Sequence, residues 1–208
     1  MATVYLVRHG ETDWPLVNQR RLIGAANDLA PLTGEGERQV LAAAERLRQA
    51  HVGLLVASPM TRALQSAALL SRALGVPLRV EFDLHEWVPD RTYSWDSPAQ
   101  VVAAYEELLR AGGEWPAEGP RPRWEPVSAV RQRVRGVLAR YADADATIAA
   151  VTHAGVITAL TGHDAALAEV VPYDPSVVPA QHDPAGAPQV RNPETRSTLP
   201  LANAQGDG

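Results

Sequence analysis

Residues 4–12 read VYLVRHGET, an apolar run that passes directly into an arginine, a histidine and a glycine. Valine, tyrosine and leucine in succession favour a buried β-strand, and Gly10 predicts where that strand ends. Arg8 and His9 should therefore stand at the carboxyl end of the strand, the edge at which open α/β sheets bind their ligands. A cation beside an imidazole at such an edge favours an anionic ligand. The alternative is a surface Arg-His pair that follows an edge strand.

Three later stretches combine with the first into an ordered set: SPMTRA at 58–63, LHEW at 84–87 and VTHAGVI at 151–157. In this order the four motifs resemble the histidine phosphatase superfamily, which includes cofactor-dependent phosphoglycerate mutase and many small phosphatases. The resemblance covers roughly residues 3–173. It implies an α/β fold with three layers, α/β/α, and a mostly parallel central sheet. The motifs say little about the substrate.

The composition excludes several classes of protein. The 208 residues suffice for one α/β domain with a proper core, and 46% of them are hydrophobic. A net charge of -5 argues against a nucleic-acid-binding surface, which is normally basic. The chain has no cysteine, so it has no disulfide, no thiolate metal site and no cysteine nucleophile. No cluster has metal-ligand spacing, and we expect neither a metal nor another cofactor.

The start of the chain shows no basic segment followed by an apolar stretch and a cleavage site, as a secretory signal would. No apolar run approaches the length needed to cross a bilayer. We therefore expect a cytoplasmic protein without a membrane partner, whose ligand is a small-molecule phosphate monoester. A homodimer is compatible with the sequence.

Hydrophobic periodicity and turn residues predict alternating strands and helices. The expected strands are 4–7, 52–57, 77–82, 147–152 and 167–173. The expected helices are 34–50, 59–74, 98–110, 127–141 and 154–161. Between the first strand and the first helix, residues 9–33 are expected to form a long loop, with Thr33 as the cap of the helix that follows. Pro59 is expected in the first turn of its helix, and Gly75 at the end of that helix.

Two segments are expected to stand apart within this pattern. Residues 83–126 are predicted to form a lid within a single domain that spans residues 1–173. Residues 174–208 are interpreted as a proline-rich tail, because they have little apolar periodicity with which to offset their ordering entropy.

The resemblance implies a two-step phosphoryl transfer through a phosphohistidine. His9 would attack phosphorus as a neutral imidazole, its second ring nitrogen fixed by a backbone carbonyl. Arg8 and Arg62 offer planar forks for phosphoryl oxygens, and His153 would add a further donor. The helix that starts at Ala154 would aim its positive dipole end at the same group.

Eight residues are expected to bind substrate. They are Arg8, Gly10, Thr12, Asn18, Arg21, Arg62, His153 and Ala154. The remaining histidines match no part of the family pattern and are interpreted as structural: His51, His85, His163 and His182.

The leaving oxygen needs a proton, and the water of the second step needs a base. One carboxyl group can serve both needs if its pKa lies near the working pH. Glu86 matches the acidic position of the family best, and Trp87 and Val88 could desolvate it. Asp83 and Asp90 remain alternatives, as does a solvated Glu86 without a catalytic role.

One position departs from the family pattern. The family commonly has an asparagine three residues after Arg-His-Gly-Glu-Thr, and that asparagine helps to hold phosphate. Here the position is Pro15, which has no side-chain donor and no backbone N–H. Asn18 or an arginine from Arg20-Arg21 could substitute for it.

Three functions follow from these observations. The leading interpretation is a phosphomonoesterase that acts on a small soluble substrate. The second is a phosphoglycerate mutase, whose relatives carry a longer insertion in the lid, and the third is a degenerate member used as a binding or regulatory module. The tryptophans of the lid could favour an apolar or aromatic leaving group, or could simply pack the lid: Trp87, Trp95, Trp115 and Trp124.

Overall fold

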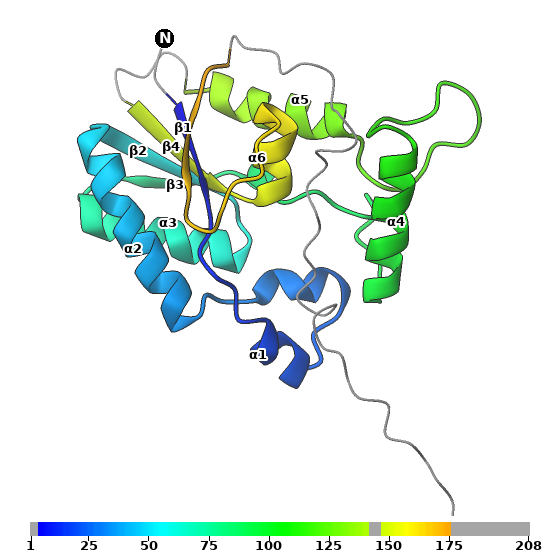
Figure 1. Ribbon diagram of the computed structural model, residues 1–208, viewed down its shortest axis with the longest axis horizontal. Coiled ribbons are helices and arrows are strands. Elements are labelled where there is room, and N and C mark those ends of the chain that lie inside the picture. The colour runs from blue at the N-terminus through cyan, green and yellow to red at the C-terminus, as the bar shows by residue number, and fades with distance from the viewer. Residues whose placement is uncertain (1–3, 142–146, 176–208) are drawn as a thin grey trace, which may run out of the picture.

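The computed structural model describes residues 4–141 and 147–175, which form an α/β fold around a five-stranded sheet (Figure 1). The strands lie in the order β3-β2-β4-β1-β5. All neighbours are parallel except β5, which runs antiparallel to β1. Their bounds are β1 (Val4–Arg8), β2 (Val52–Ala57), β3 (Leu78–Val80), β4 (Thr147–Thr152) and β5 (Val170–Tyr173). The expected mostly parallel sheet is confirmed.

Helices cover both faces of the sheet. Successive side chains of the central strands point to opposite faces, so they pack into two different hydrophobic cores. In β4, Ile148 packs with the core of α5 and α6, and Ala149 packs with the core of α2 and α3. The α-helices are α1 (Trp14–Gln19), α2 (Gly34–Gln49), α3 (Thr61–Leu74), α4 (Pro98–Arg110), α5 (Val127–Ala139) and α6 (Ala154–Thr161). Two 3-10 helices are η1 (Gly24–Leu29) and η2 (Phe82–Leu84).

The carboxyl ends of β1, β2 and β4 meet at one edge of the sheet. Backbone hydrogen bonds continue past the strand ends, from His9 N to Thr152 O at 3.1 Å and from Ser58 N to Val151 O at 3.0 Å. The residues that follow these three strands are thereby brought side by side. In Figure 1, α1 and η1 lie at this same edge.

Two expectations about helices were wrong. Residues 9–33 are not one loop, because they contain α1 and η1. The Asp13 side chain accepts a hydrogen bond from Leu16 N, and Pro15 lies in the first turn of α1, where its missing N–H costs nothing. Pro59, by contrast, lies outside its helix: α3 begins at Thr61 with Met60 as the N-cap residue. Arg62 still falls in the first turn.

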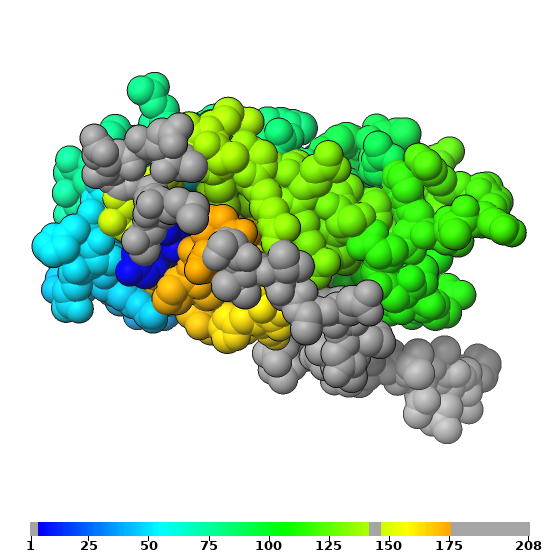
Figure 2. All heavy atoms as spheres, turned by 90° about the horizontal axis from the view of Figure 1, so that it is seen from above, coloured from blue at the N-terminus to red at the C-terminus, as the bar shows by residue number. Residues whose placement is uncertain are grey.

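The segment predicted as a lid contains η2, irregular chain, α4 and the connection to α5. Its residues, green in the space-filling view, lie at the end of the molecule opposite α2 (Figure 2). Trp124 is buried in the core, while Trp87 and Trp115 pack against it. Three of the four lid tryptophans therefore serve packing. The expected tail lies outside the described residues from residue 176 onward.

Candidate active site

His9 follows β1 directly and is held at both ring nitrogens. Its Nδ1 lies 2.7 Å from the carbonyl oxygen of Gly10, and its Nε2 lies 3.3 Å from Nε of Arg62. A carbonyl only accepts, so Nδ1 carries the proton, and Nε2 keeps a lone pair. Burial, aided by the charge of Arg62, holds the pKa of His9 well below its ordinary value. The imidazole is therefore neutral, and Nε2 is the ring nitrogen that carries the lone pair.

Arg62 stands in the first turn of α3 and is buried. Its Nη2 donates to the Met60 sulfur at 3.4 Å, and its Nη1 lies 3.6 Å from Oδ1 of Asp28, a residue of η1. That distance allows electrostatic attraction but exceeds a hydrogen bond. Within the described residues, Nη1 has no hydrogen-bond partner. Arg62 thus retains a buried donor beside His9.

His153 immediately precedes α6, and its ring centroid lies 5.2 Å from that of His9. Its Nε2 is 2.8 Å from Oγ of Ser58, which itself accepts a hydrogen bond from Met60 N at 3.3 Å. When the Ser58 hydroxyl donates to Nε2, the imidazole proton lies on Nδ1. Burial holds the pKa of His153 well below its ordinary value. The ring is therefore a neutral donor.

Two buried nitrogens of residues next to His9 lack a hydrogen-bond partner among the described residues. In the part of the chain that the structure describes, neither Arg62 Nη1 nor His153 Nδ1 makes a hydrogen bond, although both are buried. A buried unsatisfied donor costs about 1–3 kcal/mol, and more when it is charged. An anion with several oxygens, bound beside His9, would satisfy both donors. The arrangement is suited to a phosphoryl group.

Arg8 and the turn after it complete the surroundings of His9. Arg8 Nη1 donates to the Ala165 carbonyl at 2.7 Å, and the Arg8 charge helps to lower the pKa of His9. Gly10 N donates to Ser66 Oγ at 3.2 Å. Thr12 is buried, and its hydroxyl has no hydrogen-bond partner among the described residues.

Glu86 is half-buried between the lid and the start of α6. Its Oε1 accepts from Trp87 N at 2.8 Å, and its Oε2 accepts from Gly155 N at 3.3 Å. A Cβ atom on Gly155 would lie 2.5 Å from Glu86 Oε1, so only glycine admits the carboxyl group at this distance. Burial lowers the pKa of Arg62, and the nearby carboxyl groups of Asp28 and, to a smaller extent, Glu86 act against that lowering.

The alternative carboxyl groups are engaged differently. The Asp90 carboxylate accepts hydrogen bonds from Thr92, Ser94 and Arg123, and those from Thr92 do most to lower its pKa. Asp90 therefore stabilises its own loop as a carboxylate. Among the described residues, the carboxyl group of Asp83 makes no hydrogen bond or ion pair with His9, Arg62 or His153, although its backbone carbonyl is bound by Arg133. These contacts favour Glu86.

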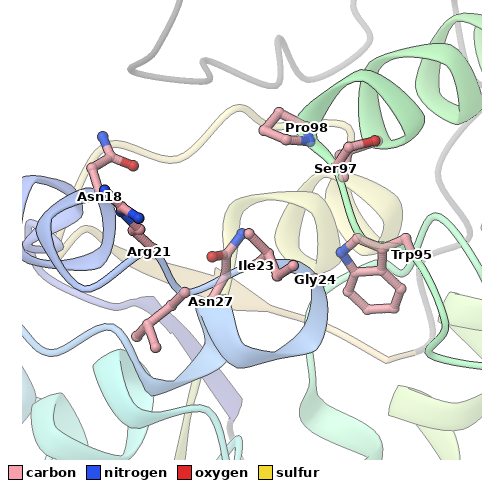
Figure 3. A pocket seen from close by; sticks show the side chains of 10 residues that line it. Asn18, Arg21, Ile23, Gly24, Asn27, Trp95, Ser97 and Pro98 are labelled. Carbon is pink, nitrogen blue, oxygen red and sulfur yellow. The ribbon is translucent and has the colours of Figure 1, made fainter.

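Asn18 and Arg21 line a cavity of about 180 Å³ between the α1–η1 segment and the lid (Figure 3). Opposite them stand Trp95, Ser97 and Pro98. None of the residues around the His9 imidazole is among those that line this cavity. Asn18 and Arg21 thus contribute to this cavity, and His9, Arg62 and His153 do not.

Three residues at the site were not singled out from the sequence. Ser58 orients His153, and Ser66 accepts from Gly10 N and donates to the Arg62 carbonyl at 2.7 Å. Asp28 faces Arg62, while burial raises the pKa of Asp28. Ser58 lies in a motif that could have identified it. Nothing in the sequence distinguishes Asp28 from other acidic residues in polar segments.

The other histidines lie apart from His9. His163 pairs with Glu169, and His51 follows α2 on the surface with a φ of 52°. His85 is different, because its Nδ1 lies 2.6 Å from the Glu86 carbonyl. His182 lies outside the described residues.

Metal and membrane features can be assessed only for the described ranges, 4–141 and 147–175. Within them, no three or more His, Cys, Asp or Glu side chains are grouped so that they could hold a metal ion. No helix within them has both the length and the apolar character needed to cross a membrane.

Comparison with protein families gives a match to the histidine phosphatase superfamily (branch 1) over residues 4–169. The probable phosphoglycerate mutase GpmB of Enterobacter sp. (strain 638) is 40% identical over 142 residues, 67% of this chain and 62% of that protein. Its Salmonella typhi counterpart is 37% identical over 86 residues, 41% of this chain and 38% of that protein. The chain thus matches less than two thirds of the length of these relatives.

Solved structures also resemble the chain. A mycobacterial glucosyl-3-phosphoglycerate phosphatase is 28% identical, with a TM-score of 0.56 and coverage of 77% of each chain. The protein TTHB049 from Thermus thermophilus is 28% identical, with a TM-score of 0.54 and coverage of 83% of this chain and 93% of that one.

Proposed function

Because the chain belongs to the histidine phosphatase superfamily, we propose that it is a phosphomonoesterase that hydrolyses a small soluble phosphate ester through a phosphohistidine at His9. The observation that carries the proposal is the state of His9. Its proton is committed to the Gly10 carbonyl, its pKa is lowered, and Nε2 faces a buried arginine.

In the first step, His9 Nε2 attacks phosphorus and the ester oxygen leaves. Arg8, Arg62 and His153 bind the three remaining oxygens, where charge accumulates in the transition state. Glu86, protonated at this stage, gives its proton to the departing alkoxide. The products are the free alcohol, phospho-His9 and the Glu86 carboxylate.

In the second step, the Glu86 carboxylate removes a proton from water as the water oxygen attacks phosphorus. The bond from phosphorus to Nε2 breaks, and inorganic phosphate leaves. Glu86 is again protonated and His9 is again neutral, so the cycle closes. The N–H groups of Trp87 and Gly155 hold the carboxyl group through both steps.

We assign the alcohol part of the substrate to the cavity of Asn18 and Arg21. Asn18 and Arg21 supply polar groups and Trp95 supplies an aromatic surface, which together suit a leaving group with both characters (Figure 3). In this role Asn18 and Arg21 select the substrate, while Gly10, Thr12 and the start of α6 at Ala154 adjoin its phosphoryl end.

The proposed function is tested by trapping the intermediate. Rapid quenching with labelled substrate should yield an acid-labile, base-stable phosphoenzyme in the wild type. His9→Ala should lose turnover by on the order of a thousandfold or more, because the covalent route disappears. Label that remains on the His9→Ala protein would refute the assignment of the nucleophile.

A phosphoglycerate mutase is the second candidate, because the curated relatives carry that name. A mutase must keep its phosphoenzyme from water, so its site must close tightly. Here much of the segment 87–126 is irregular, and Pro15 lacks the amide expected at its position. Both observations favour water as the acceptor. A degenerate binding module is disfavoured, because His9, Arg62 and His153 are grouped together.

A direct comparison separates phosphatase from mutase. We expect 3-phosphoglycerate with catalytic 2,3-bisphosphoglycerate to yield little 2-phosphoglycerate in an enolase-coupled assay. The same preparation should release inorganic phosphate from several unrelated monoesters. Mutase turnover well above phosphatase turnover would instead establish the second candidate.

A further inference from the structure

Arg133 of α5 lies outside the site, yet all five of its N–H donors are used. Its Nε and Nη2 donate to the two carboxylate oxygens of Glu125 at 2.7 and 3.0 Å. Both side chains are nearly buried, with 11% and 8% of their surface exposed. The pair is a bidentate ion pair in which the planar guanidinium fork matches the carboxylate.

The other three N–H donors of Arg133 bind backbone carbonyls of one segment of the lid, residues 83–86. Nη1 donates to the carbonyls of Asp83 and His85 at 2.6 and 2.8 Å, and Nη2 donates to the carbonyl of Glu86 at 3.3 Å. Guanidinium has five donors, so none remains for solvent or substrate. Arg133 therefore fixes the backbone that carries the proposed proton donor.

Further hydrogen bonds hold this segment and the two residues after it, and two of them involve the backbone of Glu125. The indole Nε1 of Trp87 donates to the Glu125 carbonyl at 2.7 Å, and Glu125 N donates to the Val88 carbonyl at 3.1 Å. His85 Nδ1 donates to the Glu86 carbonyl at 2.6 Å. The backbone is thus held on both sides of Glu86, while the carboxyl group is held by Trp87 N and Gly155 N.

We propose that the Arg133–Glu125 pair is a positioning device that sets the Glu86 carboxyl group at the leaving oxygen. The proposal rests on the proposed function, with Glu86 as the acid. A buried ion pair adds little net stability over an apolar pair of similar volume, so stability alone does not explain it. An apolar pair could not donate hydrogen bonds to the carbonyls of Asp83, His85 and Glu86. Misplacement of a catalytic group by about 1 Å can cost on the order of a hundredfold in rate.

The test compares two esters in Arg133→Lys, which keeps a charge opposite Glu125 but has only three donors on a single nitrogen. The value of kcat/KM reports phosphoryl transfer up to release of the alcohol. An alkyl phosphate needs a well-placed acid, whereas nitrophenyl phosphate, a good leaving group, needs little protonation. We expect the alkyl-to-nitrophenyl ratio of kcat/KM to fall by about tenfold or more.

Arg131→Lys is the matched control. Arg131 lies on the same helix and donates to the Ala159 carbonyl at 2.6 Å, on the α6 side. Its replacement should leave the ratio unchanged. Backbone hydrogen exchange should rise in residues 83–88 of Arg133→Lys, stay unchanged in Arg131→Lys and stay unchanged in β4 of both variants.

The remaining outcomes are also decisive. An unchanged ratio, or equal losses on both esters, in a folded Arg133→Lys protein overturns the positioning role. If that variant does not fold, Arg133→Met/Glu125→Leu, which removes both charges, takes its place with the same expected fall in the ratio. Failure of the proposed function is seen separately, as absence of turnover and of labelled His9 in the wild type. In that case unchanged hydrogen exchange in residues 83–88 still overturns the positioning role.

Discussion

Gly155 determines how closely the Glu86 carboxyl group can approach α6. Because a Cβ atom there would lie 2.5 Å from Glu86 Oε1, the carboxyl group and a methyl group cannot occupy their places together. The Gly155 N–H that binds Oε2 would lose its partner when the carboxyl group moves. The position of the proposed proton donor therefore depends on a residue that itself has no side chain.

Gly155→Ala should therefore act as a mild version of Glu86→Gln. For Glu86→Gln we expect kcat/KM on an alkyl phosphate to fall by on the order of a hundredfold or more, and on nitrophenyl phosphate far less. Gly155→Ala should show the same direction with a smaller loss, measured by initial rates on both esters. Equal losses on the two esters would assign Glu86 a binding role and return Asp83 or Asp90 to consideration.

Gly136→Ala controls for the general effect of adding a methyl group to a helix. Gly136 lies within α5, and a Cβ atom there would meet nothing within 4 Å. Alanine is a better helix former than glycine by about 1 kcal/mol. This variant should be as stable as the wild type or more so, with both kcat/KM values unchanged.

At the scale of elements, the start of α2 is pressed against the turn that orients His9. A Cβ atom on Gly10 would lie 2.3 Å from the Gly36 carbonyl, and one on Gly36 would lie 2.2 Å from the Glu11 carbonyl. Thr33 joins the two segments, since it accepts from Gly36 N at 2.9 Å and donates to the Glu11 carboxylate at 2.6 Å. The helix is thereby part of the support of His9.

Gly36→Ala should push α2 away from residues 9–12. We expect a loss of unfolding free energy of about 1–3 kcal/mol, the usual cost of overpacking, and lower turnover because the Gly10 carbonyl shifts. Urea unfolding and nitrophenyl phosphate hydrolysis measure the two effects. Gly34→Ala, on the same helix with nothing within 4 Å of its Cβ atom, should show neither loss. Equal stability of the two variants would contradict the prediction.

Elements with long, regular patterns could be predicted from the sequence. The bounds of α4, β4 and α6 agree with the expected ranges 98–110, 147–152 and 154–161. Residues 9–33 could not be predicted in this way, because α1 is short and is fixed by the Asp13 cap. Pro59 was misplaced because proline favours the first helical position, whereas α3 begins two residues later, at Thr61.

The residues of the candidate site likewise include some that could be predicted from the sequence and some that could not. Residues that follow strands in motifs could be predicted, since parallel strands bring their carboxyl ends together. Asp28, Arg133 and Glu125 could not, because their roles depend on tertiary packing between segments far apart in sequence. Asn18 and Arg21 were predicted to bind substrate, which stays a prediction, and the structure adds that they line a cavity together with Trp95.

At the scale of the whole molecule, buried histidines couple stability to pH, and His9 and His153 show the largest effect. Burial lowers the pKa of both His9 and His153 in the folded state. In the unfolded chain each has a pKa of about 6.5, so below that pH the unfolded state binds more protons than the folded state. The unfolding free energy should therefore fall as pH falls below about 6.5, by about 1.4 kcal/mol per pH unit for each histidine.

His153→Asn isolates one of these contributions. Between pH 7.5 and pH 5.5, the wild type should lose about 1.4 kcal/mol more unfolding free energy than the variant, as measured by urea unfolding. The acid side of the wild-type activity profile should lack a step near pH 6.5, because His9 stays neutral there. Equal losses in wild type and variant would show that His153 is protonated in the folded protein.

The strand order has a consequence for biosynthesis. Within the described chain, β1 pairs only with β4 and β5, and β4 joins β1 to β2 and β3. A ribosome therefore releases His9, Arg62 and Glu86 long before it makes the strand that brings the first two together. A nascent chain or a proteolytic fragment that ends before Thr147 carries the proposed nucleophile and acid but lacks the strand that lies between β1 and β2, so the candidate site forms only with the last strands of the sheet.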